Sequence, residues 1–153
     1  MTRHVETGEL VLGLTFALER LVPPRRLEDA LAGFFALFET VAWAGGLSDR
    51  LRDERRAPPP GLEGMWYVRN IVLHQGADVL TSVIVEHGTT LDDWVLGQGI
   101  LGVPTRREWA WPPRDELPSP RSLRGADDYD EHLAGREVSP TVRAVCDALK
   151  SDA

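Results

Sequence analysis

The stretch from Met65 to Gly76 constrains the fold most, because it combines helical periodicity with polar residues that this periodicity does not require. At about 100° per residue, a helix there has one apolar stripe. The stripe consists of Met65, Val68, Val72 and Val79, with Ile71 near its edge. A second face carries Asn70 and His74, one turn apart, flanked by Trp66, Leu73 and Ala77. Arg69 starts between the two faces and can reach either. We expect the first face to pack against a core and the second to meet a partner or a ligand.

Two helices are expected before this stretch. The first, from Glu9 to Leu21, ends at Pro23-Pro24. Its apolar stripe is Leu10, Val11, Leu14, Leu18 and Leu21, widened by Phe16 and Ala17. The segment from about Arg26 to Arg55 is expected to be one long helix or two collinear ones. Its buried side is Leu27, Ala30, Leu31, Phe34, Leu37, Phe38, Val41 and Ala42.

Two features of that segment have alternative interpretations. Gly45-Gly46 indicates a kink or close packing against another helix, because each Gly costs about 1 kcal/mol relative to Ala inside a helix. The charged stretch from Ser48 to Arg56 is interpreted as a solvated helix end in preference to a binding patch. The loop 57–61, Ala-Pro-Pro-Pro-Gly, then separates this segment from the central helix.

The chain changes character after the central helix. Residues 81–87 are rich in β-branched side chains and suit either a strand or a further helix. From Gly88 to Pro120 the sequence is rich in Gly, Pro and Trp, and residues 94–96 and 108–111 are candidate strands of a small hairpin. Trp94 lies in the first of these segments and Trp109 and Trp111 in the second. The paired Trp109 and Trp111 could stack on bases, but we favour a role in closing the end of a helical core. Residues 118–128 are expected to be irregular. A short helix is expected over 128–135, and a last helix with Ser139 as N-cap and Pro140 in its first turn.

Length and composition indicate one mainly all-α domain over residues 1–153. Its core helices span about 5–87, the irregular Trp/Pro-rich segment about 88–127 and the C-terminal helices about 128–150. With 17 Lys and Arg against 24 Asp and Glu, the net charge of −7 repels nucleic acid and acidic membranes at long range, so any polyanion must be bound locally. We expect neither DNA nor a membrane as a partner.

The remaining composition argues against metal sites and membrane insertion. A single cysteine, Cys146, and four histidines show no metal-ligand spacing, so we expect no metal and no cofactor, and Cys146 is interpreted as a core residue. The polar N-terminus and the lack of an apolar run of about 20 residues indicate a cytoplasmic protein.

Arg69, Asn70 and His74 form the pattern Arg-Asn-x-x-x-His, which resembles the RNxxxH form of the RxxxxH motif of HEPN-domain proteins. The resemblance covers the motif, its amphipathic helix and the preceding helices, roughly the first half of the chain. It implies a helical bundle that forms a homodimer through the motif helix, so that two motifs face each other across a cleft. In the catalytic branch it implies metal-independent RNA cleavage in toxin–antitoxin or phage-defence contexts, and hence a cognate antitoxin as a further partner.

These residue types suit such chemistry. Attack by the 2′-hydroxyl of RNA needs proton transfer near neutral pH, which the ordinary pKa of about 6.5 allows for a histidine such as His74. The guanidinium of Arg69 can neutralise charge on the phosphate oxygens, and Asn70 can orient the imidazole or the ribose.

Two other interpretations stand beside the ribonuclease. The same face could belong to a non-catalytic HEPN-like interaction module that binds a partner protein or a nucleotide. Alternatively, the motif arises by chance in a helical domain with a Trp-rich cap. Without catalysis, Arg69 could pair with an acid such as Glu63 or Glu39, and Asn70 and His74 could be polar residues at an oligomer interface. If the motif is accidental, the two His74 side chains of a dimer would lie far apart.

Overall fold

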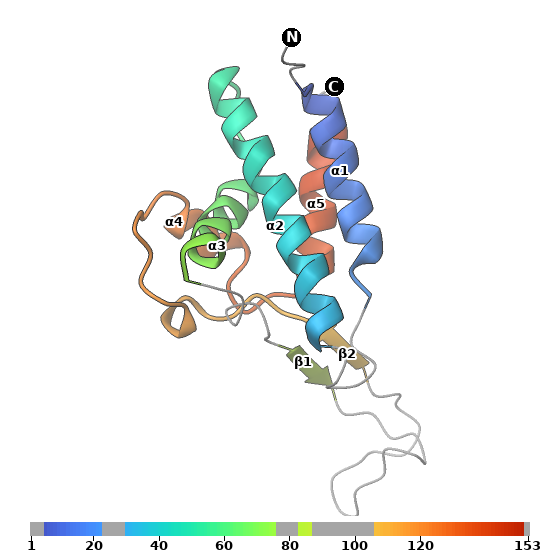
Figure 1. Ribbon diagram of the computed structural model, residues 1–153, viewed down its shortest axis with the longest axis vertical. Coiled ribbons are helices and arrows are strands. Elements are labelled where there is room, and N and C mark those ends of the chain that lie inside the picture. The colour runs from blue at the N-terminus through green and yellow to red at the C-terminus, as the bar shows by residue number, and fades with distance from the viewer. Residues whose placement is uncertain (1–4, 23–29, 76–82, 87–105, 152–153) are drawn as a thin grey trace, which may run out of the picture.

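The computed structural model of the protein describes residues 5–22, 30–75, 83–86 and 106–151. It is mainly helical, as expected, and Figure 1 shows the long helix α2 running through the middle of the molecule. The helices are α1 (Thr7–Arg20), α2 (Ala30–Asp53), α3 (Leu62–Gln75), α4 (Ala126–His132) and α5 (Val138–Ser151), with a short 3₁₀ helix, η4 (Arg114–Glu116). Helices α1 and α3 both pack on α2, α5 packs on α1, and α4 packs on α3.

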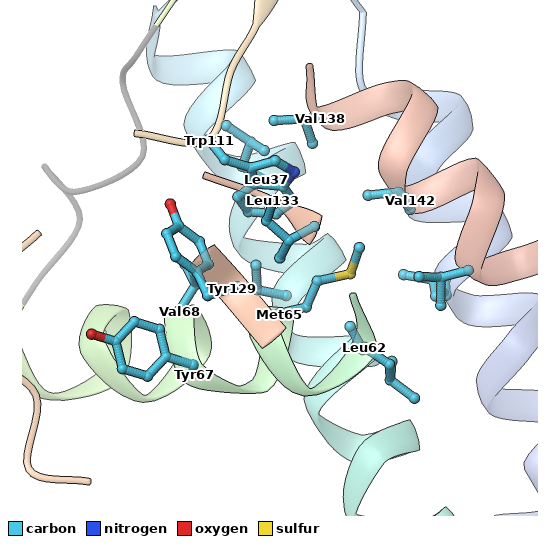
Figure 2. Packing of buried hydrophobic residues seen from close by; sticks show 14 of the residues in the cluster. Leu37, Leu62, Met65, Tyr67, Val68, Trp111, Tyr129, Leu133, Val138 and Val142 are labelled. Carbon is cyan, nitrogen blue, oxygen red and sulfur yellow. The ribbon is translucent and has the colours of Figure 1, made fainter. Parts of the chain in front are cut away.

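The central prediction for α3 is confirmed: its apolar stripe is buried. Met65, Val68, Ile71 and Val72 are each at most 4% exposed. In Figure 2, Met65 lies among Leu37 of α2, Leu133 and the α5 side chains. The expected fifth member, Val79, lies outside the described residues.

The predicted stripes of the first two helices are confirmed except at two residues, while the side chains of Leu27, Ala30 and Leu31 lie outside the described part of the chain. Leu14 and Ala17 of α1 and Leu37 and Val41 of α2 are buried. Phe16, however, is 46% exposed, and Ala42 is also exposed. Each lies beyond the strip of its helix that a neighbour covers, because a helix buries only the part of its surface that another element contacts.

Helix α2 is continuous through Gly45-Gly46, so the predicted interruption takes the form of close packing and not of a break in the helix. A Cβ added at Gly45 would overlap the Cδ of Arg69 from α3. Similarly, a Cβ at Gly13 of α1 would lie 2.6 Å from the Trp43 ring of α2. Glycine therefore provides the space in which Arg69 packs against α2 and Trp43 packs against α1.

Residues 83–86 form a strand, which decides between the two alternatives for that segment. Strand β1 (Val83–Glu86) pairs antiparallel with β2 (Arg106–Trp109), Val83 opposite Trp109 and Glu86 opposite Arg106. The expected hairpin partner, residues 94–96, lies outside the described residues, so the prediction of that strand is not tested.

The two tryptophans after β1 close the core, as favoured. Trp109 and Trp111 are at most 2% exposed. The indole N–H of Trp109 donates to the backbone carbonyl of Val22 (2.9 Å), and that of Trp111 donates to the Thr141 hydroxyl (2.7 Å). Each ring is therefore buried with its indole N–H hydrogen-bonded, and this hydrogen bond links it to a segment distant in sequence.

The C-terminal helices are placed correctly but begin earlier than predicted. Helix α4 starts at Ala126 and not at Asp128, and α5 starts at Val138, so Ser139 and Pro140 lie in its first turn and Ser139 is not the N-cap. The Asp128 carboxylate accepts hydrogen bonds from the backbone N–H groups of Gly61 (3.1 Å) and Gly64 (2.7 Å). It therefore satisfies N–H groups at the start of α3, which local sequence does not reveal.

Candidate functional site

Arg69 turns from α3 towards α2. Its stem crosses Gly45, and its Nη1 lies 3.2 Å from Oδ2 of Asp49. Arg69 therefore pairs with an acid, as the non-catalytic alternative suggested, but neither of the two acids named there is its partner. Glu39 pairs with Arg20, and Glu63 pairs with Arg124. Asp49 is the partner because it lies one helical turn after Gly45 on the α2 face that meets α3.

Asn70 and His74 lie on the other side of the motif. Asn70 is half-buried and His74 is exposed, as is Leu73 at 52%. Within the described residues, no hydrogen bond or ion pair joins Arg69 to either of them, and none to a third residue is found for Asn70 or His74. The structure therefore places the Arg69 side chain against α2 and the His74 side chain at the surface. Within one chain, the side chains of Arg69, Asn70 and His74 do not contact each other through hydrogen bonds or ion pairs among the described residues.

Arg69 belongs to a larger polar group between α2, α3 and the segment before α4. We call it the Asp49 cluster; its members are Ser48, Asp49, Glu63, Trp66, Arg69 and Arg124. Oδ1 of Asp49 accepts from the indole N–H of Trp66 (2.9 Å) and from Nη1 of Arg124 (3.2 Å). Its Oδ2 accepts from Arg69.

Arg124 is the most connected residue of the Asp49 cluster. Its Nε and Nη2 donate to the two carboxylate oxygens of Glu63 at 2.8 and 2.9 Å, and Nη2 also donates to the Ser48 hydroxyl (2.8 Å). The guanidinium carbon lies 4.0 Å from the centre of the Trp66 ring, a cation–π arrangement. The planar fork of arginine permits this combination, since lysine cannot make a bidentate contact and stack at once.

Electrostatic contacts favour the ionised forms of Glu63 and Arg124. Burial raises the pKa of Glu63, but hydrogen bonds from Arg124 and Ser48 outweigh burial and leave the pKa of Glu63 below its ordinary value. The same contact with Glu63 raises the pKa of Arg124. The two carboxylates of the cluster balance its two guanidinium groups, and Arg52, whose Nη2 lies 3.9 Å from Oδ1 of Asp49, adds a positive charge at its exposed edge.

Sequence reasoning missed the Asp49 cluster because it interpreted Ser48–Arg56 as a solvated helix end. That interpretation is wrong for Ser48, which is 1% exposed, whereas Asp49 is 39% exposed and belongs to the cluster through its hydrogen bonds. The signal was present, since Ser48 follows Ala44 and Val41 at helical spacing and so continues the buried side of α2. No comparable signal exists for Arg124, because it lies in an irregular segment 61 residues after Glu63.

Other candidate chemistry finds little support in the described part of the chain. No group of three or more His, Cys, Asp or Glu there is arranged to hold a metal ion. Cys146 is buried, and burial raises the pKa of its thiol, as fits a core residue better than a nucleophile. His132 lies 3.6 Å from Asp128, and His87 is outside the described residues. No helix among the described residues is both long enough and apolar enough to span a membrane.

Comparisons with known proteins give no match: no protein-family model fits the chain, and neither the curated proteins nor the solved structures include a significant relative.

Proposed function

We propose that this chain is a metal-independent endoribonuclease of the HEPN type, with Arg69, Asn70 and His74 as its site residues. The observation that carries the proposal is the division of α3 into two faces. One face is buried in the core, while the C-terminal half of the other presents His74 and Leu73 to solvent. The imidazole is accessible to a substrate, and a rigid helix with a packed back face holds the motif.

The proposed reaction uses the RNA's own nucleophile. The 2′-hydroxyl attacks the adjacent phosphorus, the bond from phosphorus to the 5′-oxygen breaks, and a 2′,3′-cyclic phosphate and a 5′-hydroxyl result. His74 takes the proton from the 2′-hydroxyl or gives one to the leaving 5′-oxygen. Arg69 neutralises the phosphate oxygens, and Asn70 orients the imidazole or the ribose.

One histidine cannot hold both protonation states at once, so the proposed site is formed by two protomers. The exposed Leu73 precedes His74 and supplies apolar surface where a second motif helix would pack. His74 of each protomer would then serve as base or acid for the same phosphodiester.

A non-catalytic interaction module remains the second candidate, and the Asp49 contact favours it. Arg69 already has a carboxylate partner, which an RNA phosphate must displace. In a module that only binds a partner protein or a nucleotide, the ion pair would simply be structural.

The test is cleavage of mixed RNA substrates by purified protein in EDTA. We expect the wild-type protein to cleave and His74→Gln to be slower by about 100-fold or more, which is what loss of a general acid or base costs. His132→Gln is the matched control, because it removes another partly exposed histidine from a different helix.

Circular dichroism and gel filtration are used to check that the variants keep their fold and oligomeric state. Equal cleavage by wild type and His74→Gln would refute the proposed site. No cleavage by a folded, dimeric wild-type protein would favour the interaction module.

A further inference from the structure

The contact between Arg69 and Asp49 determines how readily the motif can bind an anion. We propose that Asp49 is a positioning residue that competes with an RNA phosphate for the Arg69 guanidinium and thereby weakens phosphate binding at the motif. The choice of RNA as the anion rests on the proposed function, whereas the competition itself follows from the contacts around Asp49.

The Arg69–Asp49 pair has the geometry of an exchangeable contact. One nitrogen, Nη1, meets one oxygen, Oδ2, at 3.2 Å, so the pair is not bidentate. The Arg69 side chain is 28% exposed and that of Asp49 39% exposed, so water reaches both groups. Gly45 leaves room for the Arg69 stem, so no side chain of α2 blocks the guanidinium at that position.

Asp49 can release Arg69 without becoming an unpaired carboxylate. Its other oxygen, Oδ1, keeps the hydrogen bonds from Trp66 and Arg124 at 2.9 and 3.2 Å. Arg124 in turn is held by Glu63 and Ser48, so it does not depend on Asp49 for its place. Displacement of Arg69 therefore leaves the rest of the Asp49 cluster paired.

Charge balance gives the direction of the effect. Asp49 and Glu63 offset Arg69 and Arg124, and the whole chain carries a net charge of −7. A phosphate that approaches Arg69 thus meets a guanidinium whose charge Asp49 already offsets, in an acidic protein; the exposed Arg52 lies 3.9 Å from the other oxygen of Asp49. Replacing Asp49 with Asn removes the competing charge and leaves the cluster with one net positive charge next to the motif.

The experiment measures binding apart from cleavage. A fluorescent 2′-O-methyl RNA oligonucleotide lacks the attacking hydroxyl and is titrated, with fluorescence anisotropy as readout, against wild type, Asp49→Asn, Arg69→Gln and the double variant. We expect Asp49→Asn to lower Kd roughly two- to fivefold, as loss of one partly exposed ion pair allows. In the Arg69→Gln background the same change is expected to have no effect.

A matched control separates competition from general charge. Asp53→Asn removes the same charge from an exposed residue one turn further along α2, outside the Asp49 cluster. Should Asp49→Asn fail to fold, Gly45→Ala provides a second route, because its methyl group would displace Arg69 and leave the carboxylate in place. It is expected to lower Kd in the same direction.

Several results would overturn the competition: unchanged or weaker binding by Asp49→Asn, an equal gain in Asp53→Asn, a gain that persists without Arg69, or no binding by any variant. The outcome is distinct from that of the ribonuclease proposal. A gain that depends on Arg69, in a protein that cleaves no RNA, supports the competition and refutes the nuclease. Cleavage by the wild type without such a gain in binding supports the nuclease and refutes the competition.

Discussion

Glu63 shows how single residues of the Asp49 cluster stabilise the fold. Its carboxylate is partly buried between α2 and α3, and it stays ionised because Arg124 and Ser48 donate hydrogen bonds to it. A carboxylate whose pKa is lowered on folding stabilises the protein above its unfolded pKa. That contribution to the free energy of unfolding is lost as the pH falls through the pKa that Glu63 has in the folded protein. It therefore affects stability at acidic pH.

Glu63→Gln is therefore expected to flatten the acid limb of that profile. The free energy of unfolding of the wild type should fall more steeply than that of Glu63→Gln as the pH drops from about 5 to about 3. Urea denaturation at several pH values measures both slopes. Glu19→Gln, which removes an exposed carboxylate of α1, should follow the wild type. Parallel slopes for the wild type and Glu63→Gln would show that the ion pair adds no pH-dependent stability.

At the level of elements, the approach of α4 to α3 depends on Gly64. A Cβ added there would lie 2.9 Å from the backbone N and Cα of Tyr129, atoms that cannot move without the whole of α4. The same approach lets Asp128 reach the first N–H groups of α3. One glycine thus permits both the packing of α4 and the tertiary cap of the motif helix.

Gly64→Ala is expected to destabilise the protein by about 1–3 kcal/mol, as overpacking does, although Ala favours a helix. Gly8→Ala in α1 is the control, because nothing lies within 4 Å of its added Cβ; it should be neutral or stabilise by up to about 1 kcal/mol. Thermal and urea unfolding compare the two variants. A Gly64→Ala protein as stable as Gly8→Ala would contradict the assigned close contact.

The sequence predicted elements better than it predicted their partners. The buried stripe of α3 was predictable because Met65, Val68 and Val72 recur at helical spacing. Such spacing identifies the buried face of a helix without knowledge of the element that covers it. The Asp128 cap and the Arg124–Glu63 pair were not predictable, because residues more than 60 positions apart meet only after the chain has folded. The side to which Arg69 turns was equally undetermined, since it depends on the space that Gly45 leaves.

In the whole molecule, α3 packs one face in the core and exposes its C-terminal end at the surface. Its N-terminus is capped by α4, its apolar stripe faces α2, and its exposed end carries His74. In the proposed enzyme this arrangement gives the histidine a rigid support and leaves it open to a second protomer and to RNA. The acidic net charge then demands that phosphate binding be local, at Arg69.

The chemical identity of the RNA ends produced in EDTA tests the proposed ribonuclease most directly. Attack by the 2′-hydroxyl predicts 2′,3′-cyclic phosphate and 5′-hydroxyl ends from the wild-type protein, identified by mass spectrometry of a defined oligonucleotide. These ends should be absent when His74→Gln replaces the wild type. Products with 3′-hydroxyl ends, or the same cyclic phosphate in equal amount from His74→Gln, would contradict cleavage by this site.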